Sequence, residues 1–328
     1  MSCGQIALNR LGFDIDKYYA SEIDKYAIQV TQKNFPNTFQ IGDVTKINTE
    51  YFKDIDLLLA GSPCQGFSFA GKQLAFEDPR SALFFEFVRL LKAIKPKYFL
   101  LENVRMKKEF LEVITEQVSS CYTANDVGDE HLDMFGDVKF EPHFINSSLL
   151  SAQSRQRYYW TNIPGIKQPE DRGIVLSDVL ENGYESERDK AHCIEANYYK
   201  GANVKQYKKK HRRQLVNKPK QVGVAVDIKG HDILKRVYSP EGKSPTLTTM
   251  GGGNREPKVL EDEAHWRKLT PLECERLQTV PDNYTNHVSN TQRYKMLGNG
   301  WTVEVICHIL KNMTKTSSQN RFYDTISS

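Results

Sequence analysis

The first hundred residues contain two kinds of apolar pattern: short, nearly continuous apolar runs and longer stretches with apolar residues at helical spacing. Residues 55–60 are apolar except for Asp56 and are bounded by Asp54 and Gly61, which is typical of a buried parallel strand. Residues 80–94 carry apolar side chains at helical spacing and stop before Pro96. The same reading predicts helices at 4–12, 24–34 and 80–94 and strands at 17–23, 39–41, 55–60 and 97–101. This alternation predicts an α/β fold with a doubly wound parallel sheet.

Chemically active side chains fall where these predicted strands end. Glu22, Asp43, Cys64 and Glu102 each lie at a strand's carboxyl end, at intervals of 21, 21 and 38 residues that are each enough for one βα unit, so we expect them to meet at one rim. Pro63 and Gly66 turn the chain out of its strand, so Cys64 is expected to be an exposed nucleophile. If the strands before Cys64 and Glu102 are neighbours, both side chains can reach one small substrate. A small buried cysteine in a structural turn is the alternative for that thiol taken alone.

The second half of the chain changes character. We expect residues 117–142 to be a surface insertion and 144–150 to be a strand, followed by an extended segment in which Arg155 and Arg157 share one face. Short irregular segments with glycine-rich residues 250–254 then predict a small domain at 165–258. A helix capped by Thr270, Pro271 and Glu273 and a last helix at 303–311, opened by residues 298–301, return to the first pattern. The predicted division is therefore 1–164 and 259–313 for one domain, 165–258 for the other, and a disordered polar tail at 314–328.

Composition narrows the class of protein. No apolar run approaches the roughly 18 residues that span a bilayer, and the first residues lack signal-peptide features, so we expect a soluble cytoplasmic protein. Six cysteines without a C-x-x-C pair indicate neither a disulfide framework nor a zinc site, and no metal is expected. Residues 199–243 hold 13 Lys and Arg against three acidic residues, although the net charge of the whole chain is only +4. Such a block favours nucleic acid as partner, while a solvated basic loop remains the alternative.

Taken together, five short motifs resemble those of the DNA cytosine-5 methyltransferases, in that family's order. They are Ser62-Pro63-Cys64-Gln65, Glu102-Asn103-Val104, Gln153-Ser154-Arg155-Gln156-Arg157, Ser244-Pro245-Thr246 and Gly298-Asn299-Gly300. The agreement extends over nearly the whole chain except 117–142 and 165–243. The resemblance implies a Rossmann-like methyltransferase sheet that uses S-adenosylmethionine, with residues 165–258 as a target recognition domain for double-stranded DNA.

What the resemblance implies for single residues follows from the chemistry of cytosine. Carbon 5 becomes nucleophilic only after a thiolate adds to carbon 6, and Cys64 would supply that thiolate. Glu102 would act at the ring nitrogen, Arg157 near the carbonyl oxygen, and Arg155 would brace the site or a phosphate. The implied cofactor contacts are Gly4, Glu22, Ile23, Asp43, Val44, Pro63, Asn299, Gly300 and Trp301.

The implied DNA contacts fall into two groups. Gln65 and Ser68 belong to a loop that would close on a flipped-out base. The phosphate contacts would be Lys208, Lys209, Lys210, Arg212 and Arg213. We also expect a monomer located with the nucleoid, in a bacterial or phage-like setting, with a cognate restriction endonuclease as a further partner.

One departure from the family pattern concerns the beginning of the chain. The family's first strand ends in a Phe-x-Gly turn against the cofactor, and Met1 follows just after that point. We interpret this as a start placed too far downstream or a shortened chain rather than a defective copy. The expectation is weak cofactor binding by the chain as given, restored when a strand ending in Phe-Asp-Gly is added.

Three other classes of protein are alternatives for this chain. A nicotinamide-dependent oxidoreductase would explain Glu22 but neither the Pro63-Cys64 turn nor the basic block. The tRNA-methylating branch of the same fold would have a Cys-Phe-Thr tripeptide where this chain has Cys274 followed by Glu275. A DNA-binding protein without catalysis would be separated from both by a measurement of cofactor binding.

Overall fold

The computed structural model describes residues 1–61, 82–181, 186, 188–200, 207–208, 210, 212–217, 223–224, 236–238, 258–259 and 266–313. The chain forms two compact units. Unit 1 comprises Met1–Asn146, Gln156–Glu170 and Val303–Ser328, and unit 2 comprises Ser147–Arg155 and Asp171–Thr302. The predicted domains, 1–164 with 259–313 and 165–258, were defined by their expected functions, whereas the two units are defined by contacts within each. The predicted boundaries remain a prediction.

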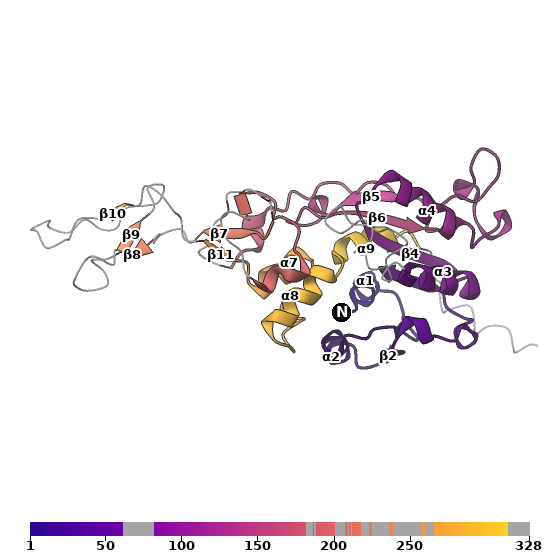
Figure 1. Ribbon diagram of the computed structural model, residues 1–328, viewed down its shortest axis with the longest axis horizontal. Coiled ribbons are helices and arrows are strands. Elements are labelled where there is room, and N and C mark those ends of the chain that lie inside the picture. Colours follow the sequence, from indigo (N-terminus) through magenta and orange to yellow (C-terminus); the bar gives the residue numbers. More distant parts are fainter. Residues whose placement is uncertain are drawn as a thin grey trace, which may run out of the picture. The chain divides into compact units, whose positions relative to one another are not determined.

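Unit 1 contains most of the regular structure (Figure 1). Its helices are α1 (Cys3–Arg10), α2 (Lys25–Asn34), α3 (Ala82–Ile94), α4 (Lys108–Ser119) and α9 (Val303–Leu310). Its strands are β1 (Tyr19–Ala20), β2 (Phe39–Gln40), β3 (Leu57–Gly61), β4 (Tyr98–Val104), β5 (His143–Asn146) and β6 (Gln156–Thr161). Short 3-10 turns are η1 (Val44–Lys46), η2 (Thr49–Tyr51), η5 (Ala124–Asp126) and η6 (Asp129–His131).

The strands of unit 1 pair into two sheets. Strands β1 and β2 are parallel partners, and a four-stranded sheet has the order β3-β4-β6-β5. Strands β3 and β4 are parallel, as predicted, whereas β6 runs antiparallel to both β4 and β5. The parallel arrangement predicted from the first hundred residues is therefore confirmed for β3 and β4, and the later strands β6 and β5 add an antiparallel edge to the sheet.

Helices cover both faces of the four-stranded sheet. On one face, Phe84 and Leu91 of α3 and Ile114 of α4 pack with Phe99 of β4 and Trp160 of β6 in the main apolar core. On the other face α1 approaches so closely that a Cβ on Gly4 would overlap the side chain of Leu59 in β3. Helix α9 packs against α1. This two-sided cover is the doubly wound arrangement that the sequence predicts.

Unit 2 is built from short elements. Its helices are α7 (Pro271–Leu277) and α8 (Asn290–Asn299), and its 3-10 turns are η7 (Ser147–Leu149), η8 (Leu176–Val179) and η9 (Ala196–Lys200). Its strands are β7 (Leu215–Asn217), β8 (Gly223–Val224), β9 (Arg236–Tyr238), β10 (Lys258–Val259) and β11 (Trp266–Lys268). Strand β7 pairs antiparallel with β11, and β9 lies between β8 and β10. The cap of α7 is confirmed: Thr270 and Glu273 form a reciprocal capping box with Pro271 at the first position.

Three local predictions differ from the structure. Helices α4 and α8 were missed, and residues 298 and 299 close α8 rather than open the next helix. The strand predicted at 144–150 ends at Asn146, where η7 begins. The predicted tail at 314–328 and the glycine-rich stretch at 250–254 lie outside the described residues. None of the helices in the described ranges is long and apolar enough to cross a lipid bilayer.

Candidate active site

An ion pair between Glu102 and Arg157 marks the end of β4. The Nε atom of Arg157 lies 2.8 Å from Oε1 of Glu102, and both side chains are largely buried. Val104 is the register partner of Arg157, so Glu102 and Arg157 are diagonal neighbours across the antiparallel pair β4 and β6. A carboxyl group and a guanidinium held together in this way can serve as a proton site and a stabilising cation for one planar ligand.

Strand β3 ends beside the strand that carries Glu102. Its last residue, Gly61, is the register partner of Glu102 in β4, and Cys64 follows Gly61 by three positions in the sequence. Strands β3 and β4 are therefore neighbours, which is the condition for the Cys64 and Glu102 side chains to reach one substrate. Pro63, Cys64, Gln65 and Ser68 themselves lie outside the described residues.

Arg155 differs from Arg157 in its surroundings. It directly precedes β6, which begins at Gln156, and the common face expected for the two arginines remains a prediction. The side chain is 4% exposed and donates to the carbonyl oxygens of Gly298 (3.3 Å) and Gly300 (3.0 Å) through Nη2, and to Ile194 (3.4 Å) through Nη1. These contacts tie together segments of unit 2, and a direct part in catalysis remains a prediction.

Two carboxylates lie at the ends of the parallel strands β1 and β2. Glu22 Oε1 accepts from the amides of Ile23 (2.8 Å) and Asp24 (2.9 Å), and Asp43 Oδ1 accepts from the amide (3.0 Å) and hydroxyl (2.9 Å) of Thr45. The hydrogen bonds from Thr45 hold the pKa of Asp43 below its usual range. Each carboxylate uses one oxygen on its own turn, and the second oxygen binds no other described residue. Two oriented acceptors that follow a pair of neighbouring parallel strands suit the hydroxyl and amino groups of a nucleoside.

Apolar and backbone groups complete this end of the unit. The side chain of Ile23 is 77% exposed directly beside Glu22, so it offers an apolar surface that no part of the described chain covers. The carbonyl oxygens of Val44 and Ile47 each accept from Arg89 of α3 at 3.1 Å. The sequence analysis missed Arg89 because its helical position looked solvent-facing, yet it fixes the turn that carries Asp43 and Val44. Gly4 is buried against Leu59, so packing alone accounts for a glycine there.

The remaining cofactor candidates end helix α8 in unit 2. Asn299 is exposed, while Gly300 and Trp301 are half-buried. The amide of Gly300 donates to the carbonyl of Met296 at 2.8 Å, so the helix closes on this residue.

The basic candidates are placed unevenly. Lys208 and Lys210 are exposed, and Lys209 lies outside the described residues. Arg212 forms a two-point ion pair with Glu195, which occupies its guanidinium. Arg213 has a φ of +59°, an uncommon backbone conformation for a residue with a side chain.

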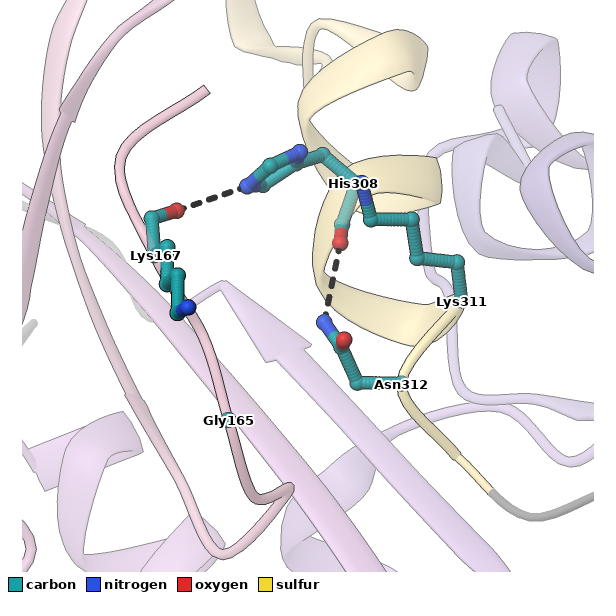
Figure 2. Close-up of a pocket in the computed structure, with 5 residues that line it drawn as sticks. All are labelled: Gly165, Lys167, His308, Lys311 and Asn312. Atoms are coloured by element: carbon teal, nitrogen blue, oxygen red, sulfur yellow. Dashed lines mark hydrogen bonds between the residues drawn. The ribbon is translucent and has the colours of Figure 1, made fainter. Parts of the chain in front are cut away.

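A separate hollow lies in unit 1, away from the predicted residues. It measures about 290 Å³ and is lined by Gly165, Lys167, His308, Lys311 and Asn312. Figure 2 shows His308 of α9 reaching the carbonyl oxygen of Lys167, a contact of 2.7 Å. Since no predicted site residue lines it, the hollow is not part of the candidate site. Among the residues that the structure describes, no cluster of three His, Cys, Asp or Glu side chains offers a metal site.

Comparisons with known proteins show the family of this chain. The family model for C-5 cytosine-specific DNA methylases matches residues 2–315. The type II methyltransferase M.HhaI of Haemophilus parahaemolyticus is 31% identical, over 90% of this chain and 86% of its own length. The orphan methyltransferase M.SPBetaI of Bacillus phage SPbeta is 28% identical, over 95% of each chain.

A solved structure extends the comparison to the fold. A DNMT2 mutant of Spodoptera frugiperda superimposes with a TM-score of 0.58 at 19% identity, covering 94% of this chain and 96% of its own. The match shows the same Rossmann-like α/β fold. The chain thus belongs to the C-5 cytosine-specific DNA methylase family and is a DNA (cytosine-5-)-methyltransferase with S-adenosylmethionine as its methyl donor.

Proposed function

We propose that this chain methylates carbon 5 of a flipped-out cytosine in duplex DNA, with Cys64 as the covalent nucleophile. The observation that carries the proposal is the Glu102–Arg157 ion pair at the end of β4, beside the strand end that leads into Cys64. Three residues of chain span at most about 10 Å, so the thiol and the carboxyl group can act on one base.

The reaction then divides among three side chains. The thiolate of Cys64 adds to carbon 6, and the electron pair of the 5,6 double bond makes carbon 5 nucleophilic. Glu102 holds a proton at the ring nitrogen, and Arg157 stabilises the charge that develops on the carbonyl oxygen. Bound S-adenosylmethionine supplies the electrophilic methyl group. Loss of the proton on carbon 5 lets the thiolate of Cys64 leave and restores the aromatic ring.

The chain's own groups suit a nucleoside-containing cofactor at β1 and β2. Glu22 would accept from the ribose hydroxyls, Ile23 would pack on the adenine, and Asp43 and Val44 would bind its amino edge. The open carboxylate oxygens of Glu22 and Asp43 support these roles. We assign Gly4, Pro63 and residues 299–301 to the same cofactor on the strength of the family motifs.

Recognition of DNA falls to residues 165–258. The exposed Lys208 and Lys210 support contacts with phosphates, which attract a duplex without reading its sequence. Gln65 and Ser68 would close on the extruded base. A monomer that acts on the nucleoid, with a matching restriction endonuclease, is the setting that we propose.

The tRNA-methylating branch remains the second candidate, and the environment of Cys274 speaks against it. That thiol is fully buried in α7, and burial together with the neighbouring Glu273 and Glu275 holds its pKa well above the ordinary range. Burial of this kind is typical of a structural cysteine, and Glu275 follows it where the tRNA-methylating branch would have phenylalanine.

Bisulfite sequencing tests the proposal directly. DNA from cells without cytosine methylation of their own, expressing this chain, should show protected cytosines in one short sequence context. The matched control is Cys64→Ser, which should leave every cytosine convertible. Unprotected DNA from cells that contain the folded wild-type chain would contradict the proposal.

A further inference from the structure

The backbone at the end of α8 is held by buried side chains from elsewhere in unit 2. Gln278 Nε2 donates to the carbonyl oxygens of Leu297 (2.6 Å) and Gly300 (3.3 Å). Arg155 Nη2 donates to those of Gly298 (3.3 Å) and Gly300 (3.0 Å). Three carbonyl groups of the 297–302 segment are therefore fixed by only two side chains. Some of these bonds satisfy the open end of the helix, as any helix requires.

Gln278 does more than cap that end. Its side chain is 0% exposed, and Oε1 accepts from Thr302 Oγ1 (2.9 Å) and from Gln153 Nε2 (3.3 Å). The Gln278 amide therefore forms hydrogen bonds with Leu297 and Thr302, at the two ends of the 297–302 segment, and also with Gln153. The next residue, Thr279, has a φ of +52°, which is a costly backbone conformation for a β-branched side chain. Strain of this kind persists where the surrounding contacts impose it, and it clusters at functional positions.

A second contact limits where the segment can lie. A Cβ on Gly298 would overlap the backbone of Glu195 and Ala196, so only glycine permits this approach. The backbone carbonyl groups around Asn299 and Trp301 accept hydrogen bonds from Gln278 and Arg155, so these contacts hold the backbone that carries the exposed Asn299 and the half-buried Trp301.

We propose that Gln278 is a positioning residue that, together with Arg155, holds residues 299–301 ready for the cofactor. The inference rests on the proposed function, because that proposal assigns these three residues to S-adenosylmethionine. Gln278 acts through the segment and touches no reacting atom. When the segment is loosened, only a fraction of molecules is competent to bind, and the apparent affinity falls by that fraction.

The test compares two variants of Gln278 with a matched control. Gln278→Ala removes the side chain, and Gln278→Met keeps its volume but not its hydrogen bonds. Gln214→Ala is the control, because Gln214 is 1% exposed in the same unit and its amide binds Tyr207, Leu215 and His192 instead. Calorimetric titration with S-adenosylhomocysteine and hydrogen exchange of a peptide covering 296–302 are measured on each full chain.

Both Gln278 variants should bind the nucleoside about tenfold more weakly, with duplex affinity unchanged within about twofold. The amides of 299–302 should exchange about tenfold faster, and Gln214→Ala should change neither quantity. A Gln278→Met chain that melts earlier but keeps wild-type affinity and exchange would reduce Gln278 to a structural role and overturn the inference. If the nucleoside binds neither the wild type nor the chain extended by a strand ending in Phe-Asp-Gly, the proposed function fails, and the exchange measurement alone still decides whether Gln278 positions the segment.

Discussion

His143 shows how a single side chain in β5 reports on the packing of unit 1. Its ring is partly buried, and burial together with the nearby His131 lowers its pKa below the ordinary value of 6.5. The folded chain therefore takes up this proton less readily than the unfolded chain. As the pH falls through 6.5 the unfolded state is protonated first, so the free energy of unfolding decreases until the lowered folded pKa is passed.

A His143→Gln variant should lose that part of the pH dependence. Urea unfolding between about pH 8 and pH 5 should show a smaller decrease in the free energy of unfolding toward the acid side for the variant than for the wild type. His131→Gln removes the smaller cause and should flatten the wild-type curve only in part. Curves of wild type and His143→Gln that stay parallel would show that His143 titrates alike in both states.

At the scale of elements, Glu275 fixes the connection between α7 and α8. Its buried carboxylate accepts from the amides of Asn283 (2.7 Å) and Thr285 (2.8 Å), from the Thr285 hydroxyl, and from Nη2 of the buried Arg293 (3.1 Å). Glu275→Ala leaves the Arg293 charge without this partner, so we expect a loss of about 3–5 kcal/mol in the free energy of unfolding.

The exposed ion pair of Lys108 with Glu112 in α4 supplies the contrast, since Glu112→Ala should cost about 0.5 kcal/mol or less. Denaturant midpoints of the two variants measure the difference. Equal losses would mean that the buried carboxylate contributes no more than a surface pair.

The elements that could be predicted are those with local signals. The start of α7 has a local signal, because Thr270 and Glu273 form a capping box and Pro271 occupies the first helical position. The sequence therefore predicts this helix correctly. Helices α4 and α8 have Lys107 and Ser289 as N-caps without a side-chain hydrogen bond, so the local start signal is missing, although α4 carries apolar residues at helical spacing. The role of Gln278 could not be predicted from the sequence for another reason. Its hydrogen-bond partner Gln153 is 125 residues away in the chain, and such a contact forms only when the chain folds. For Glu102 and Arg157 the motif predicted the residue types, and the strand register explains why they meet.

For the whole molecule, the basic block predicts how binding depends on salt. Neutralising the exposed Lys208 and Lys210 should weaken binding to all duplexes alike and make the slope of log affinity against log salt shallower by up to about 0.9 per contact. Lys107→Gln with Lys108→Gln on α4 is the control of equal charge. An equal change of slope in the Lys208/Lys210 variant and in the Lys107/Lys108 control would show that the basic block does not contact the DNA. Arg212 is left in place because Glu195 already pairs with its guanidinium.

The central claim is that Cys64 forms a covalent bond to carbon 6 of the target cytosine. A duplex carrying 5-fluorocytosine in the recognised sequence cannot lose the substituent on carbon 5, so the adduct should accumulate once the methyl group is transferred. Intact-mass spectrometry should find the wild-type chain joined to one DNA strand, with the attachment on the Cys64 peptide. The Cys64→Ser chain should bind the same duplex without forming the adduct, because a hydroxyl at neutral pH is a far weaker nucleophile than a thiol. An adduct of equal yield in the Ser variant, or one attached to another residue, would contradict the account.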